Sequence, residues 1–225
     1  MFYLDASIQL TKNLLGMADD ARILKSEGFD EFESMKKSIA TNNAAGISFI
    51  LLPKLFLSIF IDDYEGAVLV ARKIQRSNCD NLTAFDMQYI AFLTALSEMI
   101  VARQTKRKRF LKAGNKALKR LEEMTRRCSD KSWLNRIFLV KAERDAFEGS
   151  IDESIRKFNH SIALSKEFGF VHEQALAYER LGVLYSDLQY SEKPAECLRK
   201  ARDLYEEWGC AIKVSRMNYL LSGRA

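Results

Sequence analysis

The sequence of 225 residues has only two prolines and two histidines, and its ten glycines are scattered singly along the chain. Such glycines form no phosphate-binding loop of the GxxxxGK[ST] or GxGxxG type, and the motifs of a protein kinase catalytic loop are missing as well. Neither His160 nor His172 has a second histidine or cysteine at metal-ligand spacing. We therefore expect a protein without catalytic activity, bound metal or cofactor.

Cysteine pairs and the features of a signal peptide are also missing. The four cysteines lie far apart without a CxxC pair, which favours free buried thiols in a reducing compartment. The N-terminus lacks the basic and apolar blocks of a signal peptide, so we expect a cytoplasmic protein, with the nucleus as the alternative. The most apolar stretch, residues 47–61, contains Pro53 and Lys54 and is shorter than the roughly 20 residues that span a bilayer. It predicts a buried helix, kinked by Pro53 or beginning near it, and no transmembrane segment.

Charge is abundant but unevenly placed. Charged residues make up 29% of the chain and hydrophobic residues 48%, which is typical of a folded protein. Residues 103–127 contain eleven basic residues and two acidic ones, a net charge of +9 (11 − 2), whereas the rest of the chain has 24 basic and 28 acidic residues, or −4. The basic character of the protein is therefore one local feature.

Three interpretations of this basic run are open. It can be a solvated helix face with a basic loop, a patch that binds an acidic protein surface, nucleic acid or lipid, or, at residues 106–109, a nuclear localisation signal. Phe110 is the only aromatic residue within it, which gives little support to specific nucleic-acid recognition. The candidate interaction patch consists of Arg103, Lys106, Arg107, Lys108, Arg109, Lys112 and Lys116.

The clearest pattern is a repeat with a period of about 40 residues. Glu167-Phe168-Gly169 recurs as Glu207-Trp208-Gly209, and in the same register Ala142 aligns with Gly182 and Phe158 with Leu198. Repetition at this period between helical segments indicates an α-solenoid of antiparallel helical hairpins, in which neighbours bury each other's apolar faces. The residues expected to pack between the repeats are Ala142, Phe158, Phe168, Gly182, Tyr185, Leu198, Ala201 and Trp208.

We predict one all-α domain over residues 1–225, with about five hairpins and no sheet. Residues 2–41 form an irregular N-terminal part, residues 43–128 divergent hairpins, and residues 132–209 the two clearest repeats. Residues 210–221 form a helix that caps the C-terminal end. Asp62-Asp63 and Thr83-x-x-Asp86 are typical helix starts.

Leu181-Gly182-x-x-Tyr185, followed by Ala195, Leu198 and Ala201, resembles a tetratricopeptide repeat, with Pro194 where a typical repeat has alanine. A longer segment is similar to the helical region that follows the AAA-type ATPase module in very large multi-sensor serine/threonine and histidine kinases. The residues that carry this likeness are Gly169-Phe170-x-x-Glu173-x-Ala175-Leu176-Ala177-Tyr178-Glu179, Trp208-Gly209-x-x-x-Lys213-Val214, Leu139-x-Lys141-Ala142-Glu143 and Asp63-Tyr64-Glu65-x-Ala67.

The resemblance implies a regulatory interaction segment, related to or cut from such a signalling protein, and not an enzyme. The expected partner is a protein or peptide in the concave surface of the solenoid, such as an ATPase or kinase domain. The alternative is a helical protein that binds nucleic acid or an acidic surface through residues 103–127, although nucleic acid is the less favoured partner. Binding that weakens steeply with salt would distinguish the alternative.

Overall fold

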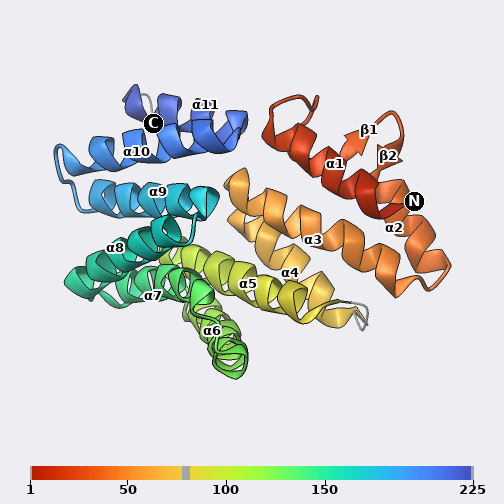
Figure 1. The fold of residues 1–225 in the computed structure, drawn as a ribbon, viewed down its shortest axis with the longest axis horizontal. Helices are drawn as coiled ribbons and strands as arrows, with labels where there is room; N and C mark the ends of the chain where they lie inside the picture. The colour runs from red at the N-terminus through yellow and green to blue at the C-terminus, as the bar shows by residue number, and fades with distance from the viewer. Residues whose placement is uncertain (1, 78–81, 224–225) are drawn as a thin grey trace.

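The structure is a computed structural model, which describes residues 2–77 and 82–223. Over these residues the chain forms eleven α-helices, one 3-10 turn and a two-stranded hairpin (Figure 1). The elements are α1 (Phe2–Leu14), β1 (Lys25–Ser26), β2 (Phe29–Asp30), α2 (Glu31–Ala40), α3 (Ala44–Phe60), α4 (Tyr64–Arg76), α5 (Ala84–Thr105), α6 (Lys108–Cys128), η1 (Lys131–Trp133), α7 (Leu134–Glu148), α8 (Ile151–Glu167), α9 (Val171–Asp187), α10 (Lys193–Trp208) and α11 (Ala211–Leu221).

The expected all-helical class, with neighbouring helices packed in pairs, is therefore what the structure shows. The expectation of no sheet is wrong at one place, where β1 and β2 pair antiparallel over two residues each. Pro53 lies inside α3 and not in its first turn, so the buried helix begins nine residues earlier, at Ala44. The turn expected from Asn78 to Leu82 lies mostly outside the described residues.

Side chains cap the N-terminal ends of α4 and α5, as the sequence indicates. The carboxylate of Asp63 accepts a hydrogen bond from the backbone N–H of Gly66 at the start of α4. Thr83 and Asp86 form a reciprocal capping box at the start of α5. Each cap satisfies N–H groups that have no partner inside the helix, and this fixes where the helix begins.

The tight connections between helices share one backbone turn. In six of them the residue after the left-handed residue of the turn donates its N–H to a carbonyl five positions back, the 6→1 bond of a Schellman motif. These bonds are Asn43 to Ser38, Asp63 to Ser58, Ser150 to Asp145, Phe170 to Ser165, Tyr190 to Tyr185 and Cys210 to Tyr205. The residue between, in the left-handed conformation, is glycine in three turns and Asn42, Asp62 or Gln189 in the others. The turn geometry therefore repeats more regularly than the sequence does.

The helices stack in chain order through most of the molecule. From α7 to α11 each helix packs against the next, whereas α5 packs against α4, α6 and α7 together. Helix α3 lies between α1, α2, α4 and α5. The two ends of the array then meet, because α1 contacts α11 (Figure 1).

Helix α5 lies at the centre of the core. Among the described helices it alone is long and apolar enough, by length and composition, to cross a membrane. However, 72% of its most apolar 18-residue window is buried by the surrounding helices. This burial is what a central core helix of a helical domain requires.

Candidate functional site

Most residues expected to pack between the repeats do so. Ala142, Phe158 and Ala201 are fully buried, and Tyr185 and Leu198 are nearly so. They lie on α7, α8, α9 and α10, which pack in sequence.

Gly182 lets α9 and α10 approach closely. A Cβ atom at this position would lie 3.2 Å from Cβ of Cys197 and 3.2 Å from Cγ of Leu198. Such contacts are tighter than ordinary van der Waals distances, so even a methyl group at this position would require Cys197 or Leu198 to shift by a few tenths of an ångström. This glycine serves helix packing, although in a helix interior glycine costs roughly 0.5–1 kcal/mol against alanine.

Two aromatic residues of the repeat differ from the expectation that they are buried anchors. Phe168 keeps 37% of its surface exposed, because it lies in the C-terminal cap of α8 at the edge of the stack. Trp208 is only partly buried, and its ring packs 5.0 Å from Phe60 of α3 and 5.0 Å from His172 of α9. Trp208 therefore joins α10 to α3 and α9, whereas the ring of Phe168 lies 6.3 Å from that of Phe170 in the adjoining turn.

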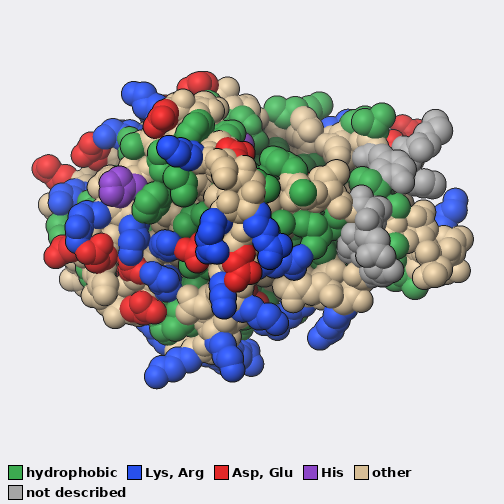
Figure 2. Space-filling model, turned by 60° about the horizontal axis from the view of Figure 1, so that its bottom comes forward, with side chains coloured by type: hydrophobic (Ala, Val, Ile, Leu, Met, Phe, Trp, Pro, Cys, Tyr) green, Lys and Arg blue, Asp and Glu red, His purple; other side chains and the backbone are tan. Residues whose placement is uncertain are grey.

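The basic segment is divided between core and surface. Arg103 is a correction to the candidate patch, because it lies on the buried face of α5 and forms an ion pair with Glu143, 3.1 Å away. The other six members are exposed, and none of them forms an ion pair with a carboxylate of the described residues. These six are Lys106, Arg107, Lys108, Arg109, Lys112 and Lys116. Figure 2 shows Lys and Arg side chains gathered over the side of the molecule where α6 lies.

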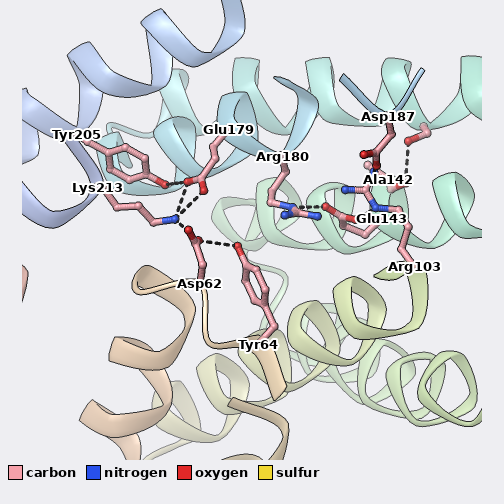
Figure 3. Close-up of polar contacts among 11 residues, drawn as sticks. Asp62, Tyr64, Arg103, Ala142, Glu143, Glu179, Arg180, Asp187, Tyr205 and Lys213 are labelled. Atoms are coloured by element: carbon pink, nitrogen blue, oxygen red, sulfur yellow. Dashed lines mark hydrogen bonds and ion pairs between the residues drawn. The ribbon is translucent and has the colours of Figure 1, made fainter. Parts of the chain in front are cut away.

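A buried ionic network links helices distant in the sequence (Figure 3). Nζ of Lys213 on α11 lies 2.6 Å from Oε1 of Glu179 on α9 and also bonds to Asp62 between α3 and α4. The hydroxyl of Tyr205 donates to Oε2 of Glu179 at 2.6 Å, and that of Tyr64 to Asp62 at 3.1 Å.

Burial alone would lower the pKa of Lys213, but the carboxylates of Glu179 and Asp62 outweigh it and raise that pKa. Burial raises the pKa of Glu179, while Lys213 pulls it back down. Each charge in the pair therefore depends on the other to stay ionised.

The network continues through Arg180, whose guanidinium lies 5.4 Å from the ring of Tyr64. Nε of Arg180 donates to Oε1 of Glu143 at 2.6 Å, and Arg103 is the second cation on that carboxylate. Burial would raise the pKa of Glu143, but the two guanidinium groups outweigh it and lower the pKa. The chain of contacts thus joins α4, α5, α7, α9, α10 and α11.

A second buried cluster surrounds Arg136 of α7. Its guanidinium donates to Glu173 of α9 at 2.7 Å and lies 4.3 Å from the ring of Trp133. Burial, with repulsion from Arg136, lowers the pKa of His172 to about 4. His172 is thus a neutral packing residue at physiological pH, whereas His160 is exposed on α8.

A cleft of about 870 Å³ runs along α5 between α4 and α6. Its rim contains Arg72 of α4 with Lys116, Lys119 and Arg120 of α6. Its floor contains Thr94 and Glu98 of α5, which are buried. Lys116 is the one member of the candidate patch that lines this cleft.

The cysteines follow the expectation in part. Cys197 and Cys210 are buried, and burial raises the pKa of each thiol to about 11. Cys128 is exposed at the end of α6, contrary to expectation, and Cys79 lies outside the described residues. In residues 2–77 and 82–223, no three His, Cys, Asp or Glu side chains come together as a metal site would require.

Sequence reasoning missed the partners in the ionic network, namely Asp62, Glu143, Glu179, Arg180 and Lys213. The available signal is a charged residue within an otherwise apolar helix face, as at Ala142-Glu143. No model of a known protein family matches the chain, and no curated protein shows significant sequence similarity to it.

Proposed function

We propose that this protein is a non-catalytic, tetratricopeptide-like interaction scaffold. In this proposal it is related to the regulatory helical segment of large signalling ATPases and kinases and acts in the cytoplasm. The resemblance at residues 132–214 supports this assignment, as does the stacked arrangement of α7 to α11. Its partner would be a protein or peptide, for example an ATPase or kinase domain.

The observation that carries the proposal is the contrast between core and surface charge. Inside, Lys213, Arg180 and Arg136 are each paired with a buried carboxylate, which makes them structural. Outside, Lys116, Lys119 and Arg120 of α6 line an open cleft and form no ion pair with any carboxylate that the structure describes. A rigid body with unsatisfied surface charge beside a cleft suits recognition of a partner.

The partner site we favour differs from the general concave surface expected from the sequence. Where α3 meets α9 and α10, the inner face is filled by the chain's own Phe60, His172 and Trp208. We favour the cleft between α4 and α6, which offers an open volume of about 870 Å³.

Selection from a random peptide library with the full chain tests the scaffold proposal. We expect enriched peptides that bind saturably with fixed stoichiometry in calorimetry, whereas scrambled versions do not bind. We also expect no ATP hydrolysis above that of a heat-treated control. Hydrolysis that co-purifies with the protein and disappears when His160 or His172 is mutated would contradict the proposal.

The second candidate is a protein that binds nucleic acid or another acidic surface through residues 103–127. The six exposed cations of the patch, which form no ion pair within the described part of the chain, favour it. Phosphate contacts release counterions, so binding of this kind would weaken steeply between about 50 and 200 mM salt. Import into the nucleus through residues 106–109 would belong to this second candidate.

A further inference from the structure

The cleft beside α5 has the length of a short helix. Its floor runs along α5 from Met87 to Glu98, and its α6 wall runs from Ala113 to Glu123. At a rise of 1.5 Å per residue each stretch is about 15 Å long, or three helical turns. Because α4 and α6 both pack on α5 at its sides, the space above the floor is where a further helix would lie.

Small side chains leave room in this cleft. Ala91 lies in the floor, and Ala113 and Ala117 project from α6 four residues apart, on the same side of that helix. Ile90 and Ile74 provide larger apolar surface nearby. Apolar side chains of a partner, spaced one turn apart, can therefore enter between the helices.

The rim carries more positive than negative charge, because four cations line the cleft, Arg72, Lys116, Lys119 and Arg120, against the carboxylates of Glu98 and Glu123. Lys116, Lys119 and Arg120 are exposed, and no carboxylate of residues 2–77 or 82–223 forms an ion pair with any of them. Arg72, on the opposite wall, is paired with Glu98 at 3.3 Å but keeps 42% of its side chain exposed. The rim therefore complements carboxylates on the flanks of a partner helix.

The floor has two buried polar atoms that find no hydrogen-bond partner among the described residues. They are Oγ1 of Thr94 and Oε2 of Glu98, in side chains that are 4% and 3% exposed. A buried polar atom without a partner costs about 1–3 kcal/mol, so a donor supplied to this floor is strongly favoured. Burial raises the pKa of Glu98, while Arg72 lowers it.

We propose that this cleft binds an acidic amphipathic helix of a partner protein, about three turns long. Its apolar face lies over Ala91 and Ala117, its carboxylates contact Lys116, Lys119 and Arg120, and one hydroxyl or amide donates to Glu98. This inference rests on the scaffold function and names the chemistry of the partner.

A fluorescein-labelled synthetic helix tests the inference by fluorescence anisotropy with the full chain. The probe has 14 residues, with leucines at i, i+4 and i+7, one central asparagine on that face, and glutamates on both flanks. We expect saturable binding by this probe. A second probe, with lysine in place of each glutamate, should not bind.

Two variants report whether the cleft is the site. Reversal of Lys116, Lys119 and Arg120 to glutamate should weaken binding by about tenfold or more, the sum of several modest charge contacts. The matched control reverses Lys106, Arg107 and Lys108, which carry the same charge but do not line the cleft. This control should weaken binding much less, because such distant charges are screened.

Ala117→Trp fills the cleft without changing charge and should also abolish binding. Circular dichroism melting must show that this variant is folded, and Ala146→Trp, on a partly buried surface of α7 outside the cleft, is its control. Equal loss in both charge-reversal variants would overturn the inference, because general electrostatic attraction would then explain binding.

Other outcomes separate this inference from the proposed function. If library-selected peptides bind but protect a different surface from hydrogen exchange, the cleft inference fails and the scaffold function stands. If oligo(dT) displaces the acidic helix, and if oligo(dT) binds more weakly only to the control variant, the cleft inference fails. The nucleic-acid candidate is then favoured. If no peptide binds at all, both proposals fail.

Discussion

Lys213→Met should show how strongly the buried network holds the two ends of the chain together. Lys213 is 1% exposed and faces two carboxylates, Glu179 on α9 and Asp62 at the end of α3. Methionine keeps the length of the side chain but removes the charge. Removing one member of a buried ion pair leaves the other uncompensated, which costs about 3–5 kcal/mol of folding free energy. Small proteins have about 5–15 kcal/mol in total, so the loss is large.

The pH dependence of this loss has a definite sign. Without Lys213, burial raises the folded-state pKa of Glu179 further above its unfolded value. A carboxyl group whose pKa is higher in the folded state takes up a proton on folding. The stability that this protonation gives to the folded state is therefore lost as pH rises. The difference between wild type and Lys213→Met should therefore be greater at pH 8 than at pH 5.

Urea denaturation followed by circular dichroism at both pH values measures this difference. Lys200→Met is a matched control, because Lys200 forms an exposed pair with Glu196 one turn away, and we expect almost no change. Adding Glu179→Gln to Lys213→Met should restore part of the stability, since the orphaned carboxylate is then gone. If Lys213→Met loses no more than Lys200→Met, or if its loss is the same at both pH values, the reasoning is wrong.

Three further predictions concern α9 and α10. Gly182→Leu should destabilise by about 1–3 kcal/mol through overpacking against Leu198, with Gly182→Ala intermediate in melting temperature, and an unchanged melting midpoint for Gly182→Leu would contradict the close helix approach. The folded-state pKa of His172 is about 4, below its unfolded value of about 6.5, so the wild type should lose about 3 kcal/mol as pH falls between these values. His172→Phe should lose less over the same range in urea titrations, and equal losses would show that His172 is accessible to protons. In a Trp133→Phe background, Trp208 should show partial iodide quenching, weaker than free tryptophan, and full quenching would count against its packing on Phe60.

Local sequence determined the helices and much of their ends. The carboxylate of Asp63 and the Thr83–Asp86 box fix where α4 and α5 begin, because a cap involves residues only three positions apart. The 40-residue register also identified Ala142, Gly182 and Leu198 as packing positions, since small and apolar residues recur where neighbouring helices meet. The same register was wrong for Phe168, because an aligned position does not ensure an equivalent neighbour.

The tertiary structure decided which charges are buried and where the chain is open. Arg103 belongs to the basic run by sequence, yet it is buried in the core, where it forms an ion pair with Glu143. Lys116 belongs to the same run but lies on the rim of a cleft. Lys213 meets Asp62 across 151 residues of sequence. Helical periodicity is a property of neighbouring residues, and it places a charged side chain on a helix face without saying which distant face will cover it. Only the closure of the array, which brings α11 to the end of α3, determines that partner.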